Sequence, residues 1–299
     1  MFKFLNHIDT VYAGLPVKCK YNHKIDYLEN KLCLKIIGDI EKSEKVLICL
    51  HGIGGNKDSG YINSMINSFI DEFKNDCIIA PDMPGINGSI NTDKFWGVQK
   101  KVADIFIDDI ISYVKNKNKD IKIFIVAFSG SCGSLINYLT DDGNIIRNNN
   151  KDLIIHSYLI SPTGPYLDCL LWIRDNSIFN SYISFFHTKQ QILFLLKKKN
   201  FKKLFTLNKS ILLDAILSNV WINGNDEYKF NFGKTVKNCD IYLSKYDPIT
   251  NYETVMNYFT SLKGINITEK ILGGHVGFKN FFSKKRNHEI FVLNSIKKT

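Results

Sequence analysis

The sequence predicts an α/β protein with a mostly parallel central sheet flanked by helices and a helical cap insertion. The chain has 299 residues, 44% of them hydrophobic, which is enough to bury a large core. Short apolar runs alternate with amphipathic stretches, as parallel strands alternate with crossover helices. Between about residues 165 and 233 this alternation stops, and the sequence becomes helical in pattern, aromatic and basic. We therefore expect residues 1–299 to form a single domain with a cap inserted at 165–233.

The strands of the sheet are expected where the short apolar runs occur. Several runs are apolar on both faces, as in parallel strands that helices cover on each side. The predicted strands span residues 32–37, 45–50, 77–80, 121–128, 153–160, 240–244 and 265–271. The amphipathic stretches predict crossover helices over residues 61–73, 93–115, 132–140, 251–262 and 288–296.

Cysteine usage and hydropathy exclude several classes of protein. The seven cysteines show no CxxC pairing, and several lie in apolar runs, so we expect buried free thiols in a reducing compartment and no metal site. Polar residues interrupt residues 1–15, which argues against a signal peptide. No apolar run approaches the roughly 18 residues of a spanning helix. The expectation is a cytoplasmic protein without a cofactor.

The formal net charge of +10 indicates either an acidic partner or a general bias toward lysine. Nucleic acid is not expected as a partner, because no nucleic-acid-binding module is recognisable. Within the predicted cap, phenylalanines alternate with lysines. Over an apolar tunnel those rings would contact acyl chains while the lysines rest on a lipid surface. The alternative is a small helical core with a solvated charged face.

The first candidate for chemistry is a glycine-rich loop between a predicted strand and a predicted helix. It reads Cys-Leu-His-Gly-Ile-Gly-Gly-Asn over residues 49–56. Glycines allow a sharp turn whose amides point at a developing oxyanion, and the N–H of Ile53 is the expected donor. Phosphate binding is the alternative, but neither GxGxxG nor a GK[ST] ending is present.

The second candidate follows the strand predicted at 121–128, where residues 127–133 read Ala-Phe-Ser-Gly-Ser-Cys-Gly. A nucleophile elbow needs small residues two before and two after its serine, because the strand and helix backbones come close together. Both Ser129 and Ser131 meet this condition. The apolar run ends at Phe128, which places Ser129 on the turn and favours it over Ser131. Gly130 would then supply the second oxyanion N–H. An ordinary N-capping serine is the alternative.

The third candidate is a carboxylate and an imidazole near the C-terminus. Asp247 follows the strand predicted at 240–244, and His275 follows the strand predicted at 265–271. Ligands bind at the carboxyl ends of such strands. An imidazole can take the proton of a serine, while a carboxylate fixes its tautomer. The order serine, aspartate, histidine therefore predicts a hydrolytic triad.

The segments HGIGGN, AFSGSCG, YDPI and GGHVGF together resemble the motifs of the α/β-hydrolase superfamily, and more narrowly those of its AB hydrolase 4 family. That family includes carboxylesterases, medium-chain ester synthases and hydrolases, and phospholipase-like proteins. The resemblance covers about residues 45–278 and is weakest in the cap. Ala127, Ser131 and Cys132 stand where the family has glycine, and a serine at the second small position is expected to crowd the turn.

The resemblance implies an enzyme that cleaves or transfers acyl groups of carboxylic or lipid esters through an acyl-enzyme. Ser129 would be the nucleophile, His275 the base and Asp247 its partner, with Ile53 and Gly130 as oxyanion donors. No motif encodes the substrate-binding residues. The alternative is an inactive α/β-hydrolase scaffold that binds a lipid or a protein through its basic cap. The same cap is the candidate for peripheral membrane contact.

Overall fold

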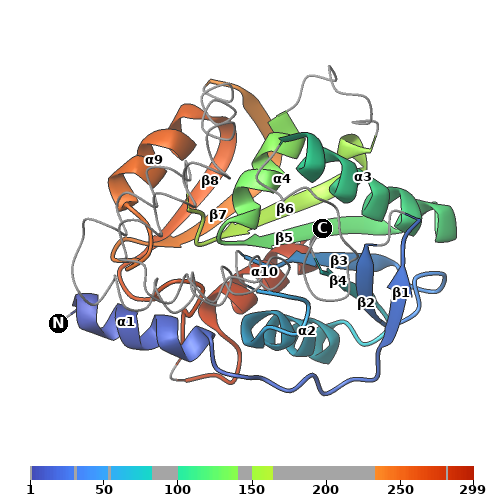
Figure 1. Ribbon diagram of the computed structural model, residues 1–299, viewed down its shortest axis with the longest axis horizontal. Helices are drawn as coiled ribbons and strands as arrows, with labels where there is room; N and C mark the ends of the chain where they lie inside the picture. The colour runs from blue at the N-terminus through green and yellow to red at the C-terminus, as the bar shows by residue number, and fades with distance from the viewer. Residues whose placement is uncertain are drawn as a thin grey trace, which may run out of the picture.

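The computed structural model describes residues 2–29, 32–52, 55–82, 100–140, 150–163, 233–280 and 282–299. In this part of the chain eight strands form one sheet, in the order β1-β2-β4-β3-β5-β6-β7-β8 (Figure 1). The strands β3 to β8 run parallel, while β2 lies antiparallel to both β1 and β4. The strands are β1 Lys24–Tyr27, β2 Cys33–Ile37, β3 Lys45–Leu50, β4 Cys77–Pro81, β5 Lys122–Phe128, β6 Ile154–Ile160, β7 Thr235–Ser244 and β8 Lys263–Lys270.

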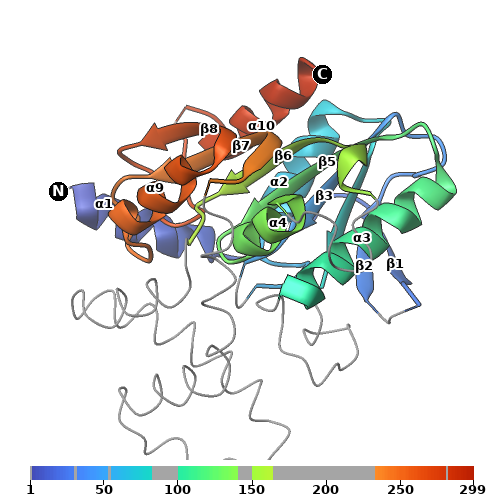
Figure 2. The same ribbon diagram turned by 90° about the horizontal axis from the view of Figure 1, so that it is seen from above.

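Helices cover both faces of the sheet (Figure 2). The side chains of α3, α4 and α9 pack against one face, and those of α1, α2 and α10 pack against the other. The helices are α1 Phe2–Ala13, α2 Gly60–Glu72, α3 Lys100–Lys117, α4 Ser131–Thr140, α9 Tyr252–Ser261 and α10 Asn287–Lys297, with a 3₁₀ turn at Lys151–Leu153. The predicted α/β class with a mostly parallel, helix-flanked sheet is confirmed.

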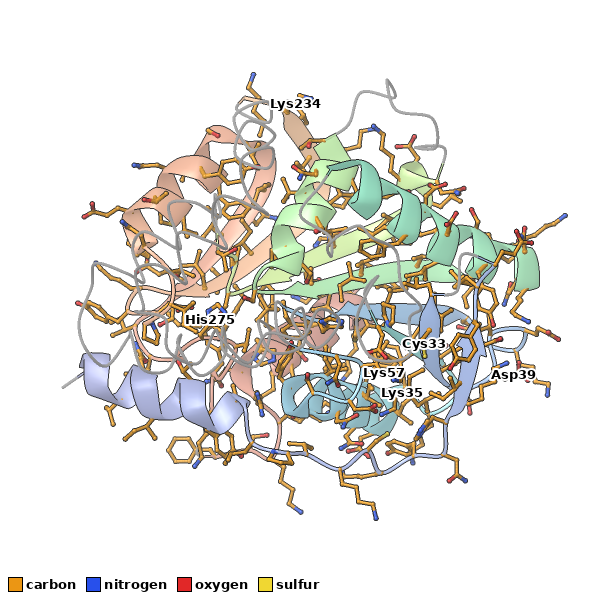
Figure 3. The ribbon with its side chains drawn as sticks, viewed as in Figure 1. Cys33, Lys35, Asp39, Lys57, Lys234 and His275 are labelled. Carbon is orange, nitrogen blue, oxygen red and sulfur yellow. The ribbon has the colours of Figure 1, made fainter. Side chains whose placement is uncertain are left out.

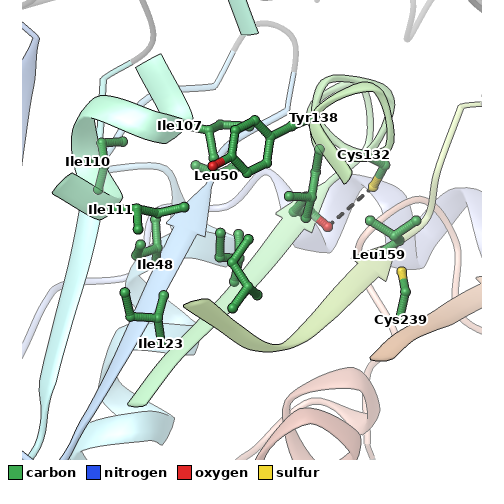
Figure 4. Close-up of a cluster of buried hydrophobic side chains, with 14 of the residues drawn as sticks. Ile48, Leu50, Ile107, Ile110, Ile111, Ile123, Cys132, Tyr138, Leu159 and Cys239 are labelled. Carbon is green, nitrogen blue, oxygen red and sulfur yellow. Dashed lines mark hydrogen bonds between the residues drawn. The ribbon is translucent and has the colours of Figure 1, made fainter. Parts of the chain in front are cut away.

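The hydrophobic core explains why the central strands read as continuous apolar runs. Figure 4 shows Ile48 and Leu50 of β3 and Ile123 of β5 beneath Ile107 and Ile110 of α3. The alternate residues of the same strands face α2 and α10 on the other side. Both faces are therefore withdrawn from water, which is the main favourable contribution to folding.

The predicted elements agree with the structure to within a few residues at most boundaries. All seven predicted strands are present, although β7 begins at Thr235, five residues before its predicted start. The helix predicted at 93–115 is described from Lys100 onward. The predictions missed β1, an edge strand whose residues are mostly exposed, and α1. The predicted cap at 165–233 falls outside the described residues, apart from Gly233.

Each cysteine that the structure describes is a free thiol, and all of these except Cys19 are buried. Burial raises the pKa of the thiols of Cys49 and Cys132 well above the ordinary value. These side chains therefore act as small hydrophobic groups in the core.

Among the helices of the described ranges, none has the combination of length and apolar character that crossing a bilayer requires.

His288 gives the core a predictable sensitivity to acid. It lies edge-on to the rings of Phe128 and Phe278, at centroid distances of 5.6 and 5.5 Å, and its two ring nitrogens have no hydrogen-bond partner. Burial lowers the pKa of His288 well below its ordinary 6.5. The neutral ring thus contributes stability that is complete above pH 6.5 and is lost as the pH falls below that value.

We expect His288→Phe to reduce this sensitivity, because a phenyl ring fills the site without a titratable group. The free energy of unfolding should drop by about 2 kcal/mol less between pH 7 and pH 5 in the variant than in the parent. Urea unfolding at the two pH values measures the difference. An equal drop in both proteins would contradict the assignment.

Candidate active site

Ser129 lies on the sharp turn between β5 and α4. Its φ is +55°, in the left-handed region that a residue with a side chain rarely adopts and that costs of order 1–3 kcal/mol. Two backbone hydrogen bonds hold the turn: Ser129 N–H donates to Ile160 O of β6 at 2.9 Å, and Cys132 N–H donates to Ser129 O at 3.1 Å. Ser129 is therefore half-buried, whereas residues 123–128 of β5, which precede it, are buried.

Ser129, His275 and Asp247 form a continuous chain of hydrogen bonds. Ser129 Oγ is 2.7 Å from His275 Nε2, and His275 Nδ1 is 2.8 Å from Asp247 Oδ2. A carboxylate only accepts hydrogen bonds, so Nδ1 carries the proton and Nε2 is left to accept the proton of the serine. His275 and Asp247 are 6% and 7% exposed, which shields this chain from water. The three predicted residues therefore meet at the carboxyl ends of β5, β7 and β8.

The backbone that follows β7 fixes the orientation of Asp247. Its Oδ1 accepts hydrogen bonds from Ile249 N–H at 2.8 Å and Thr250 N–H at 3.3 Å. This leaves Oδ2 directed at His275. The YDPI segment thus turns the chain so that one carboxylate oxygen is held by amides and the other by the imidazole.

Three side chains from different parts of the molecule hold the backbone at His275. Thr10 Oγ1 accepts the N–H of His275 at 2.7 Å, and Ser161 Oγ accepts the N–H of Val276 at 3.0 Å. Arg286 donates from Nη1 to Val276 O at 3.1 Å. Arg286 is 4% exposed. Figure 3 shows His275 above α1, near the ends of β7 and β8.

Ser131, the alternative nucleophile, has a different role in the structure. It is fully buried at the start of α4, where its Oγ accepts the N–H of Phe128 at 3.0 Å. The same oxygen lies 2.9 Å from the carbonyl oxygens of Leu50 and Phe128, to which its hydroxyl can donate. The turn accommodates this serine because its hydroxyl forms hydrogen bonds that join the ends of β3 and β5. Cys132 Sγ likewise lies 3.3 Å from Ala127 O.

The glycine-rich loop after β3 comes directly against Ser129. A Cβ on Gly52 would lie 2.8 Å from Ser129 Cβ, so this close approach requires glycine. Gly52 N–H donates to the hydroxyl of Tyr61 at 2.9 Å. Ile53, one predicted oxyanion donor, lies outside the described residues, and Gly130, the other, is buried in the turn immediately after Ser129.

An ion pair anchors the far end of this loop. Lys57 donates to Asp82 twice, from its backbone N–H at 2.8 Å and from Nζ at 2.6 Å. Asp82 follows β4 and is fully buried. At the other end of the loop, burial lowers the pKa of His51 to about 4, and its Nδ1 lies 2.9 Å from Gly52 O. The neutral His51 ring therefore donates to the loop backbone.

The sequence interpretation missed the side chains that support the base. Asn6 and Thr10 lie one helical turn apart in α1 and are both buried, yet the stretch carries no catalytic motif. The available signal was the presence of two small polar residues at i and i+4 on one side of an apolar helical stretch.

No group of three or more His, Cys, Asp or Glu side chains suited to a metal ion occurs in the described ranges.

Comparison with known proteins identifies the fold. No family model matches the chain, and no curated protein matches its sequence. Among solved structures, the esterase Pf2001 of Pyrococcus furiosus is similar, with a TM-score of 0.61 at 14% identity over 94% of this chain and 91% of that chain. Mouse alpha/beta hydrolase domain-containing protein 10 gives a TM-score of 0.56 at 10% identity, covering 93% and 97% of the two chains.

An esterase of Exiguobacterium antarcticum is similar to the same degree, with a TM-score of 0.56 at 14% identity over 93% of this chain and all of that one. These likenesses span nearly the whole length of each protein. They agree with the strand order and with the helices on both faces of the sheet. The chain has the α/β-hydrolase fold.

Proposed function

We propose that this chain is a serine hydrolase that cleaves carboxylic or lipid esters through an acyl-enzyme on Ser129. The observation that carries the proposal is the 2.7 Å approach of Ser129 Oγ to His275 Nε2, on a turn where Ser129 has a φ of +55°. A serine that only caps a helix needs neither a histidine nor a left-handed backbone. The names of the similar solved structures, two of them esterases, support the same reaction class.

In the proposed first step, Ser129 Oγ attacks the carbonyl carbon of the ester while its proton passes to His275 Nε2. The carbonyl oxygen becomes an oxyanion, which the amides of Ile53 and Gly130 would hold, each donor being worth about 3 kcal/mol. The tetrahedral intermediate then collapses. The C–O bond to the alcohol breaks, and the alcohol leaves with the proton from His275.

In the second step, water attacks the acyl-enzyme and gives a proton to His275 Nε2. Collapse returns that proton to Ser129 Oγ and releases the carboxylic acid. An alcohol in place of water would give acyl transfer by the same route. Asp247 keeps the proton of His275 on Nδ1 throughout and stabilises the imidazolium that forms in each step.

We further infer membership of the AB hydrolase 4 family from the four motifs of the sequence. Three of these motifs, AFSGSCG, YDPI and GGHVGF, supply the serine, the carboxylate and the imidazole that are joined by hydrogen bonds. The glycine at position 52 of the HGIGGN motif is accounted for by its approach to Ser129. The proposed substrate class within this family is a carboxylic or lipid ester.

Labelling with a fluorophosphonate tests the proposal directly. The reagent phosphonylates a serine only when a neighbouring base activates it, so we expect stoichiometric labelling and a mass shift on the peptide that contains Ser129. His275→Ala should remove the labelling, because it takes away the group that accepts the serine proton. A parent protein that stays unlabelled would instead favour a scaffold that binds its partner without chemistry.

A further inference from the structure

The first helix of the chain lies against the loops that carry the acid and the base. α1 approaches the segment after β8 so closely that a Cβ on Gly274 would lie 2.7 Å from Thr10 N, and a Cβ on Gly277 would lie 2.7 Å from Asp9 Cγ. Ala13 of α1 belongs to the same buried cluster as Val276 and Phe278. The glycines on both sides of His275 are therefore the positions at which a helix backbone contacts the loop.

Asn6 joins the acid loop to the base loop through one amide group. Its Nδ2 donates to Tyr246 O, next to Asp247, and to Ile271 O, both at 3.1 Å. Its Oδ1 accepts the N–H of Gly273 at 2.9 Å and that of Gly274 at 3.3 Å. Asn6 is fully buried. The donors and the acceptor of this one amide thus bind backbone groups of both loops.

Thr10 extends this contact to His275 itself. Its hydroxyl donates to Asn6 O at 2.8 Å, which leaves a lone pair that accepts the N–H of His275 at 2.7 Å. The hydrogen bond fixes the backbone from which the imidazole projects. The ring in turn must keep Nε2 near Ser129 and Nδ1 near Asp247, two contacts of 2.7 and 2.8 Å.

We propose that Asn6 and Thr10 are positioning residues that hold the His275 and Asp247 loops in register, so that α1 is part of the catalytic machinery. The expected effect on kcat rests on the proposed hydrolase function. The expected effect on the positions of the two loops rests on the hydrogen bonds alone. Displacing a catalytic group by about 1 Å can cost on the order of 100-fold in rate, so a contact that sets the base to within hydrogen-bond distance affects kcat.

The test compares three substitutions at position 10. Thr10→Val keeps the shape and removes the acceptor for His275 N–H, Thr10→Ser keeps the hydroxyl, and Thr10→Ala removes it with a residue that favours helix. We expect kcat for a p-nitrophenyl ester to fall about 10- to 100-fold in the valine and alanine variants with KM within about twofold, and the serine variant to retain most of kcat. Thr260→Val is the matched control, because Thr260 Oγ1 donates to Met256 O within the remote helix α9.

Proton NMR supplies a measurement that does not depend on activity. The Nδ1–H of His275, bonded to Asp247, should give a low-field resonance that His275→Ala removes. We expect this resonance to broaden or shift in Thr10→Val and Thr10→Ala and to persist in Thr10→Ser and Thr260→Val.

Unchanged kcat and an unchanged resonance in both Thr10→Val and Thr10→Ala would overturn the proposal. If the parent hydrolyses no ester and takes no fluorophosphonate, the proposed function fails, and the resonance still decides the role of Thr10.

Discussion

Ser129→Ala is expected to lower kcat for a short p-nitrophenyl ester by about 10⁴- to 10⁶-fold while KM changes little. The substitution removes the oxygen that lies 2.7 Å from His275 Nε2 and leaves the rest of the site in place. Substrate binding depends on other groups, so the loss falls on the chemical step. Steady-state kinetics with active-site titration of the parent measures it.

Ser131→Ala is the matched control for that loss, since it removes the neighbouring hydroxyl from the same turn. We expect it to retain kcat within about tenfold, because Ser131 is fully buried and hydrogen-bonded to the N–H of Phe128. It should cost about 1–3 kcal/mol of stability, since that buried N–H loses its acceptor. The reverse outcome, with Ser131→Ala inactive and Ser129→Ala active, would transfer the role of nucleophile to Ser131.

Asp247→Asn is expected to lower kcat by about 10⁴-fold with little change in fold. The reason lies in the two backbone N–H groups, of Ile249 and Thr250, that donate to Oδ1. They require an oxygen at that position, so the amide nitrogen of the asparagine must take the place of Oδ2 and donate to His275 Nδ1. The imidazole proton then moves to Nε2, which can no longer accept the proton of Ser129.

Asp240→Asn provides the comparison for this prediction. Asp240 also faces a histidine, with its Oδ2 2.9 Å from His156 Nε2, but it lies within β7, four residues before the strand ends. We expect kcat to stay within about twofold of the parent in this variant. Fluorophosphonate labelling rates should follow the same order, with Asp247→Asn slow and Asp240→Asn normal. Equal kcat in the two variants would argue against a role for Asp247.

The central sheet could be predicted from the sequence because its strands are apolar on both faces, a pattern that depends only on local composition. The same reasoning identified the turn at Ser129, since the apolar run of β5 stops at Phe128. Asp247 and His275 followed from the position of strand ends. These predictions rest on short stretches of sequence, each of which carries its own signal.

The contributions of α1 could not be predicted in this way. Asn6 and Thr10 bind backbone amides and carbonyls, and every residue type except proline offers the same backbone groups. The residue types in the sequence therefore do not indicate which segments Asn6 and Thr10 contact. The role of Ser131 was missed for a similar reason, since its hydrogen bonds are also made with backbone groups, of Phe128 and Leu50.

The distance along the chain between α1 and its partners has a consequence for biosynthesis. Asn6 meets Tyr246 across 240 residues and Gly273 across 267 residues, so the helix emerges from the ribosome long before the segments that it contacts. Closing a loop of that length is a slow and late event in folding. Ser129 is likewise synthesised 146 residues before His275, so the hydrogen-bonded chain of Ser129, His275 and Asp247 can form only after the segment that follows β8 has been made.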